Sequence, residues 1–214
     1  MGNAKTRTKF GRFMYDVITK ASLYVAHHKP LFYFLSYTWG ILTTIIGWIV
    51  IGFVNLFMRK EIIEKGKFFT AHYAMIGSGW GGIELGSNFL LSNCFSDKYN
   101  THVKCHELGH TYQNAVLGPF AIILVAIPSV IRYWIQTIRE ARGLWNEPYD
   151  LFWAEASASK IGETLLSEKE GKNLFYYTWY GEYEDDYFER NENYGESYGN
   201  NESECTKQEM EQEN

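Results

Sequence analysis

Apolar and polar residues recur with a helical period near the start of the chain. Between Phe10 and Val25, apolar residues are spaced three and four positions apart, as on one face of an α-helix. The basic residues around them are Lys5, Arg7, Lys9, Arg12 and Lys20. The pattern favours a basic amphipathic helix within residues 1–30 that lies on a membrane surface, and an ordinary helix of the domain is the alternative.

A longer apolar segment follows at residues 31–58, where 28 consecutive residues carry no charge. About 20 apolar residues cross the hydrocarbon core of a bilayer, so the segment predicts one N-terminal transmembrane helix. It starts too late and is too long for a signal peptide, and we expect this anchor to stay in the mature protein. Basic residues flank both ends in similar numbers, so the side of the membrane on which the domain lies stays open.

The pattern changes again over residues 68–92, which are rich in glycine, aromatic and β-branched residues. Glycine at this density disfavours a helix, whereas aromatic and β-branched residues favour strands. We predict one or two strands here, within a domain that comprises residues 59–180. A chain of 214 residues has room for one such domain.

Charge is distributed unevenly along the chain. Residues 181–214 contain twelve acidic and two basic residues and few aliphatic ones, so we predict an acidic disordered tail. The overall net charge is −5, which leaves about +5 for residues 1–180. A mildly basic domain suits an anionic lipid surface, and membrane lipid is an expected partner. The chain has no basic stretch interleaved with aromatic residues, which argues against a nucleic-acid partner.

Three cysteines, Cys94, Cys105 and Cys205, are an odd number without paired spacing. The sequence therefore predicts neither a disulfide framework nor a zinc ribbon. We interpret Cys105 as a small buried apolar residue, because neighbouring positions of a helix point about 100° apart and it cannot share the face of the adjacent histidine.

The strongest chemical signal is the pattern His-Glu-Leu-Gly-His at residues 106–110. On a helix, residues four apart lie one above the other, so His106 and His110 can bind one Zn²⁺ ion. Glu107 is then placed beside the open coordination position, where it can act as the general base. The alternative is a helix that carries two histidines by accident or holds them as hydrogen-bonded core residues.

A catalytic zinc site of this kind needs a third protein ligand. The best candidate is Glu155, because an acid among tryptophan, alanine and serine residues is out of place unless it has a partner. Asp150 and Glu163 are weaker candidates, since both lie near the ends of the predicted helix, where acids are common. An exposed Glu155 on a solvated face is the alternative.

His102 continues the row formed by His106 and His110. Eight residues rise about 12 Å along a helix, so three imidazoles in such a row are badly placed for one tetrahedral ion. We therefore expect His102 to be either a polar neighbour of the metal site or a polar residue of the first helical turn, and not a ligand.

Residues 115–131 are again free of charge. A second spanning helix would carry Glu155 about 30 Å away from the two histidines. Gly118 followed by Pro119 is typical of a helix end, and Pro128 would interrupt the helix that follows. We therefore predict a buried or interfacial helical hairpin that returns Glu155 to the metal.

An ordered set of motifs between residues 35 and 162 resembles a family of small, membrane-associated bacterial HExxH proteins of the zincin metalloprotease type. These motifs are YTWG, GWGGIELG, CHELGHTYQ, LGPF, IPSVIRYW and YDLFWAEASASKIG. The resemblance implies a gluzincin-like site in which His106, His110 and Glu155 are the ligands and Glu107 is the catalytic acid. It also implies that GGIELG is the strand that lines the substrate cleft. The later aspartate motif of the intramembrane site-two proteases has no counterpart here.

Together these features predict an α+β, zincin-like and mostly helical domain, with a short sheet before the HExxH helix and a single-pass anchor in a bacterial cytoplasmic membrane. The predicted activity is hydrolysis of a peptide or protein substrate by a zinc-activated water, with Glu107 as the base. Three tyrosines, Tyr112, Tyr133 and Tyr149, are candidate donors to the oxyanion, and the sequence does not choose among them. The alternative is a non-catalytic membrane protein with a retained structural zinc site or a partner-binding role.

Overall fold

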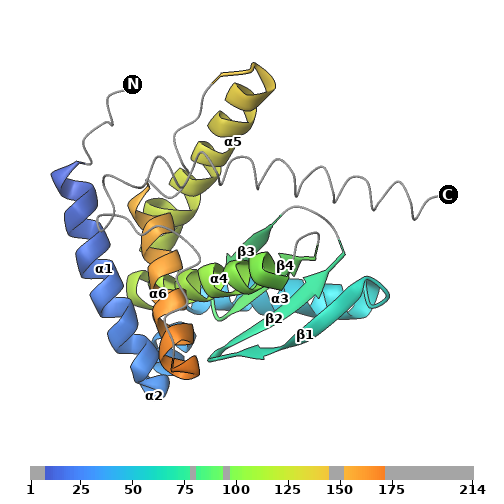
Figure 1. Cartoon of the computed structure of the whole chain (residues 1–214). Helices are drawn as coiled ribbons and strands as arrows, with labels where there is room; N and C mark the ends of the chain where they lie inside the picture. Colours follow the sequence, from blue (N-terminus) through green and yellow to red (C-terminus); the bar gives the residue numbers. More distant parts are fainter. Residues whose placement is uncertain (1–7, 78–80, 94–96, 145–151, 172–214) are drawn as a thin grey trace.

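The computed structural model describes residues 8–77, 81–93, 97–144 and 152–171, and these form helices around a small mixed sheet (Figure 1). The α+β class and the predominance of helix are as predicted. The helices are α1 (Lys9–His27), α2 (Lys29–Tyr37), α3 (Ile41–Phe57), α4 (Asp97–Leu117), α5 (Ile127–Ala141) and α6 (Trp153–Glu170). The strands are β1 (Ile62–Phe68), β2 (Ala71–Ile76), β3 (Gly82–Leu85) and β4 (Asn88–Ser92), and a π-helical turn, η1 (Ile122–Ala126), leads directly into α5.

The sheet has the strand order β1-β2-β4-β3, with β2 and β4 parallel and both outer strands antiparallel to their neighbours. The sequence predicted one or two strands over residues 68–92, whereas the sheet contains four and begins at Ile62. One of the glycines that disfavour a helix, Gly86, stands in the turn between β3 and β4, where its φ is +71°. β3 forms one edge of the described sheet and directly precedes β4 and the motif helix.

Alternate residues of the central strands belong to two different hydrophobic cores. Phe89 and Leu91 of β4 pack with Leu108 of α4, whereas Leu90 between them packs with Ile51 and other α3 side chains. This is the period of two expected for a strand that is covered on both faces. The sheet therefore lies between α3 on one side and α4 on the other.

The charge-free segment at residues 31–58 forms two helices and not one continuous helix, and its role as a membrane anchor stays a prediction. Helices α2 and α3 meet at an angle of 89°. Two hydrogen bonds hold this bend against the end of α4: the indole Nε1 of Trp39 donates to the carbonyl oxygen of Val116 at 3.3 Å, and Thr43 donates to Asn114 at 2.9 Å. Hydropathy alone did not reveal the bend, because the residues at the turn are uncharged as well.

α3 also packs on the domain instead of standing apart from it as a tether. Its buried residues are Thr44, Gly47, Ile51 and Val54, which share one face of the helix. A Cβ atom on Gly47 would lie 2.1 Å from the carbonyl oxygen of Leu85, so the glycine permits this close approach to the sheet. The outer face of α3 is apolar and exposed, and includes Leu42, Ile45, Ile49, Phe53 and Leu56.

α1 is likewise a helix of the domain. Thr8 caps its first turn by accepting a hydrogen bond from the Gly11 amide at 3.1 Å. Tyr15 and Ile18 are buried with residues of α6, and Val25 belongs to the core beneath the sheet. α1 is therefore packed on α4 and α6 as a helix of the domain, and its contact with a membrane surface stays a prediction.

The predicted hairpin at residues 115–131 is only partly correct. α4 ends at Leu117 and Gly118 follows with φ +57°, as the glycine-proline pair indicated. Beyond that turn, however, η1 and α5 form one helix of 20 residues, Ile122–Ala141, which is long and apolar enough to cross a membrane. Pro128 does not end this helix: it stands directly after the π-helical turn η1, at the start of α5.

Candidate metal centre

Two glycines allow α4 and α6 to cross in backbone contact (Figure 1). A Cβ atom on Gly109 would lie 2.0 Å from the carbonyl oxygen of Ala158. A Cβ atom on Gly162 would lie 1.9 Å from the carbonyl oxygen of Cys105, which is itself fully buried as predicted. Any side chain at either glycine would force the helices apart. The crossing brings the first turn of α6 against the motif of α4.

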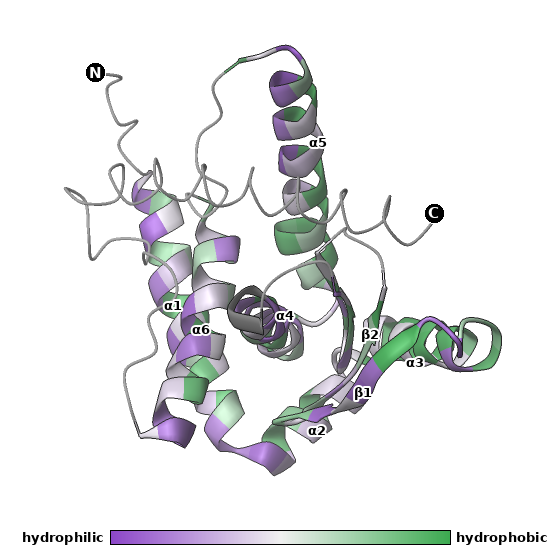
Figure 2. Ribbon diagram, turned by 45° about the vertical axis from the view of Figure 1, so that its right-hand side comes forward, coloured by the Kyte–Doolittle hydropathy of each residue, from purple (hydrophilic) through white to green (hydrophobic). Residues whose placement is uncertain are grey.

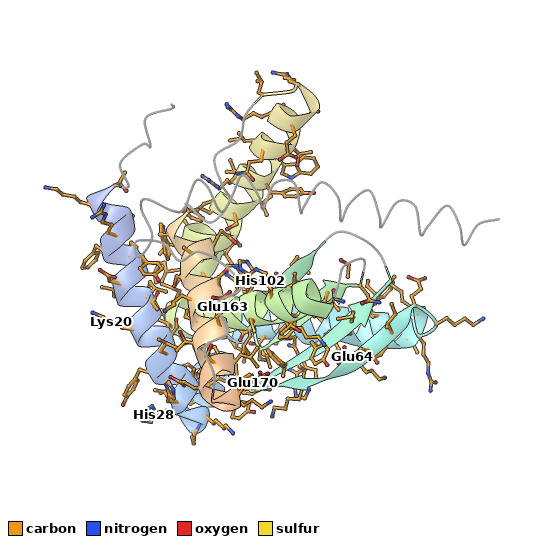
Figure 3. All side chains as sticks on the ribbon, viewed as in Figure 1. Lys20, His28, Glu64, His102, Glu163 and Glu170 are labelled. Atoms are coloured by element: carbon orange, nitrogen blue, oxygen red, sulfur yellow. The ribbon has the colours of Figure 1, made fainter. Side chains whose placement is uncertain are left out.

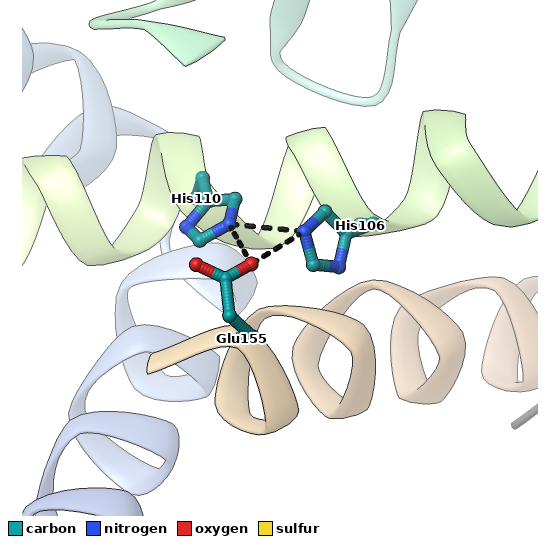
Figure 4. A group of neighbouring side chains, drawn as sticks. All are labelled: His106, His110 and Glu155. Carbon is teal, nitrogen blue, oxygen red and sulfur yellow. Dashed lines mark hydrogen bonds and ion pairs between the residues drawn. The ribbon is translucent and has the colours of Figure 1, made fainter. Parts of the chain in front are cut away.

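Three atoms of metal-ligand type converge where the helices cross (Figure 4). Nε2 of His106 lies 3.1 Å from Nε2 of His110. Oε2 of Glu155 lies 3.1 Å from the first nitrogen and 3.3 Å from the second. A tetrahedral ion with bonds of about 2.0–2.1 Å separates its ligands by about 3.3 Å. The three residues that the sequence singled out as ligands therefore lie together at metal-binding distance.

The other ring nitrogen of each histidine has a polar partner. Nδ1 of His106 lies 2.9 Å from the hydroxyl of Ser159, and Nδ1 of His110 lies 2.8 Å from Oε1 of Gln113. The amide nitrogen of Gln113 donates to the carbonyl oxygen of Ala154 at 2.8 Å, which orients Oε1 as the acceptor. A proton on each Nδ1 leaves a lone pair on each Nε2, directed at the shared point.

Glu155 is held by polar contacts although it is almost completely buried, at 2% exposure. Burial alone would raise the pKa of its carboxyl group, but His110 and His106 outweigh burial and hold the pKa well below its usual value. The hydroxyl of Ser129, at the start of α5, donates to Oε1. The second oxygen, Oε2, is the one that meets the histidines. The prediction that Glu155 is buried and partnered is therefore confirmed.

Further acidic side chains gather around these ligands. Burial raises the pKa of Glu107, an effect that His106 and His110 partly offset. Burial also raises the pKa of Glu84, on β3, to about 8, even though Asn114 and the Gly86 amide hydrogen-bond its carboxyl group. Burial lowers the pKa of His110, but Glu155, Glu107 and Glu84 reverse this and raise it to about 9. Three buried acids around two imidazoles form a site that favours a bound cation.

The edge strand β3 places its backbone directly against the proposed base. A Cβ atom on Gly82 would lie 2.6 Å from Oε1 of Glu107, so the glycine lets the carboxyl group lie this close to the strand. Glu107 is 6% exposed and stands one position after His106. The acid thus lies between the converging ligands on α4 and the first residue of β3, the strand that the resemblance assigned to the substrate cleft.

The remaining acids and histidines named as alternatives have other surroundings. Glu163 is not one of the three converging residues. Its Oε1 lies 3.4 Å from Nδ1 of His102 (Figure 3). Burial holds the pKa of His102 well below its usual value, so this contact involves a neutral imidazole. His102 stands in the second turn of α4 with its ring beside that of His106, so of the two alternatives it is a polar neighbour of the cluster. Asp150 lies outside the described residues.

Two of the three tyrosines proposed as oxyanion donors, Tyr112 and Tyr133, lie in the part of the chain that the structure describes. Tyr112 lies in the hydrophobic core, 1% exposed, where its hydroxyl is 2.8 Å from that of Thr70. Its position on α4 is opposite the histidine face, so it is removed from the candidates. Tyr133 is 55% exposed on α5, with its ring against Trp134. Tyr149 lies outside the described residues.

Sequence reasoning missed several polar residues around the cluster: Glu84, Gln113, Ser129 and Ser159. Gln113 could have been found, because it stands three residues after His110 on the same helix face. Glu84 could have been found as well, as the single charged residue of the GGIELG segment. Ser129 and Ser159 carry no such signal, since one serine among small or apolar residues is ordinary.

Comparison of the chain with protein-family models, with curated proteins and with solved structures finds no match. The zincin-like fold and the resemblance of the motifs to membrane-associated HExxH proteins therefore stay predictions. The function has to be argued from the geometry of the cluster.

Proposed function

We propose that this protein is a membrane-associated, zinc-dependent metalloprotease whose active site is the cluster on α4 and α6. The observation that carries the proposal is the convergence of Nε2 of His106, Nε2 of His110 and Oε2 of Glu155 at 3.1–3.3 Å from one another, with Glu107 buried beside them. Two imidazoles and one carboxylate are a donor set that catalytic zinc sites use, with a fourth position open.

The donor chemistry supports zinc over a hard cation. Calcium and magnesium prefer six or more oxygen ligands, whereas imidazole nitrogens suit zinc and similar transition metals. The hydrogen bonds of Ser159 and Gln113 to the Nδ1 atoms support the tautomer that such an ion needs. A zinc ion held by these three residues would polarise a substrate carbonyl and make a water molecule more acidic.

Glu107 supplies the proton transfer in this proposal. It accepts a proton from the attacking water and delivers it to the amine that leaves when the peptide bond breaks. Its raised pKa suits a group that must both take up and release a proton near neutral pH. The backbone of Gly82 restricts the carboxylate from the β3 side.

Membrane association is supported by the exposed apolar face of α3. Its 17 residues carry no charge, and Leu42, Ile49, Leu56 and Phe57 are each more than half exposed. An apolar face of this length on the outside of a domain marks a contact with lipid or protein. The bend between α2 and α3 argues for α3 as the element in contact with the membrane and against a straight anchor over residues 31–58.

Metal analysis and proteolysis on matched variants test the proposal. The purified full-length protein should contain one zinc ion, and Glu155→Ala and His106→Ala should lose it. Glu107→Gln should keep the metal and abolish cleavage of an unstructured protein such as casein. Glu168→Ala is the control on α6, since that acid is exposed and contacts only the surface residue His27 among the described residues.

Each outcome has a distinct meaning. If Glu155→Ala keeps the metal, the assignment of the third ligand is wrong. If Glu107→Gln keeps both metal and activity, Glu107 is not the base. A wild-type protein that binds zinc, unfolds when it is removed and cleaves nothing would show a structural metal site and overturn the proposed protease.

A further inference from the structure

The amphipathic helix α5 exposes its apolar side, which is unfavourable for a protein surrounded by water. Its outward residues are large and apolar, and each is about half exposed: Ile127, Val130, Ile131, Trp134, Ile135 and Ile138. The half-buried positions lie on the other side of the helix and are Pro128, Ser129, Arg132 and Gln136, of which Ser129 contacts Glu155 of the domain. Figure 2 shows the hydrophobic and hydrophilic residues of α5 along different sides of the helix. None of the residues of α5 is fully buried.

The inward polar face has a structural reason. Ser129 donates to Glu155, so the first turn of α5 is attached to a residue of the metal cluster. Arg132 and Gln136 follow at helical spacing on the same face, and both take part in polar interactions. The polar side chains of α5 therefore take part in interactions, whereas its apolar side chains are exposed.

The chemistry of the outward face favours a lipid bilayer over a second protein chain. No acid stands on it, and its apolar residues continue onto η1, where Ile123 is 62% exposed. Tyr133 and Trp134 are aromatic residues of the type enriched at the level of lipid headgroups. α3 exposes a second charge-free apolar surface, and residues 1–180 carry a net positive charge of about five, which suits anionic lipid.

The same pattern decides how the helix meets the bilayer. Ile122–Ala141 is long enough to cross. A crossing helix would, however, carry Arg132 and Gln136 into the hydrocarbon core, whereas a helix with one continuous polar face lies in the plane of the interface. We propose that the outward face of η1 and α5 is a lipid-docking surface, and that α5 lies in the bilayer interface with Ser129 and Arg132 turned toward the domain.

This arrangement also specifies a substrate class, a point that rests on the proposed function. Because Ser129 contacts Glu155, the metal cluster lies within about one helix diameter, roughly 10 Å, of the lipid that α5 would contact. Substrates of the site would then be peptide segments held at the membrane surface, such as the residues next to a membrane anchor.

Spin labels on the full-length protein test the docking surface. Cys94→Ser and Cys205→Ser leave Cys105, which is fully buried, as the single native thiol. Single cysteines then replace Ile123, Ile131 and Ile138 on the outward face. Gln136 and Glu140 provide control positions on the opposite side of α5. The labelled proteins are placed in vesicles of phosphatidylethanolamine and phosphatidylglycerol, and collision rates with oxygen and with a water-soluble nickel complex report the depth of each label.

We expect the three outward labels to show high oxygen and low nickel collision rates at one common shallow depth, while both control labels collide with nickel. Outward labels that are shielded from both reagents would indicate a protein partner and overturn the proposal. A depth that changes steadily from residue 123 to residue 138 would indicate a crossing helix and overturn it as well. The readout depends on neither metal nor proteolysis, so its failure is distinct from failure of the proposed protease.

Discussion

Helices α5 and α6 both carry a side chain to the metal cluster, but they are buried in opposite ways. α6 contains serines and two buried acids, and 12 of its 18 residues are buried. α5 is rich in isoleucine, and none of its residues is buried. In most water-soluble domains the more apolar helix lies inside. Whether a helix of this protein is buried therefore depends on how closely it packs and on whether its polar groups have partners. Hydropathy alone predicts it poorly.

α6 can be buried because its polar groups have hydrogen-bond partners and its small residues allow neighbouring helices to approach closely. Thr19 of α1 donates to Ser157 at 2.9 Å, and Ser159 lies 2.9 Å from His106. A buried hydroxyl with a hydrogen-bond partner costs little, whereas an unpaired one costs about 1–3 kcal/mol. α5 has no comparable contact surface beyond its first turn, and its apolar side faces outward.

The largest expected effect on stability comes from substitutions that force α4 and α6 apart. Gly162→Ala places a methyl group 1.9 Å from the Cys105 carbonyl oxygen, and Gly109→Ala places one 2.0 Å from that of Ala158. We expect each to lower the free energy of unfolding by about 3 kcal/mol or more and to weaken metal binding. Chemical unfolding in mild detergent and metal titration measure both.

Gly52→Ala on α3 is the matched control for these substitutions. A Cβ atom on Gly52 meets nothing within 4 Å, so alanine there should leave stability unchanged or raise it by up to about 1 kcal/mol. Equal losses for Gly52→Ala and Gly162→Ala would mean that helix propensity, and not the close crossing, governs the effect.

A smaller effect is expected at the contact that joins α5 to the cluster. Ser129→Ala removes the hydrogen bond to Oε1 of Glu155, which should reduce metal affinity about tenfold or more, because groups that orient ligands contribute 10- to 100-fold. The unfolding midpoint of the metal-free protein should change little. Ser167→Ala, in the last turns of α6, provides a control that should retain wild-type metal affinity. An equal loss of affinity there would show that the effect of Ser129→Ala does not come from its contact with Glu155.

The smallest effect contrasts one isoleucine from each helix. Ile161 is fully buried on α6, and Ile161→Val should lower the free energy of unfolding by about 1 kcal/mol, since a methylene group is removed from the core. Ile135 is 52% exposed on α5, and the same substitution should change stability by less than about 0.5 kcal/mol. Unfolding curves of both variants decide the matter. Comparable losses would show that α5 packs against protein.

Local sequence spacing predicted the core of the candidate site well. Two histidines four apart on a helix share a face wherever that helix lies, and a buried acid such as Glu155 needs a partner. The same reasoning could not find Ser129 or Ser159, whose roles depend on which helices meet. It also missed the bend within residues 31–58, because charge and hydropathy do not record the turn at Trp39.

By itself the sequence determined the helix that carries His106, Glu107 and His110, the helix around Glu155, and the end of α4 at Gly118, because each depends on residues that are neighbours along the chain. The tertiary structure decided the bend between α2 and α3, the four-stranded sheet that brings Gly82 to Glu107, and the outward direction of the apolar face of α5. These features depend on contacts between segments tens of residues apart. Side-chain period records which residues share a face, but it does not record which partner that face meets.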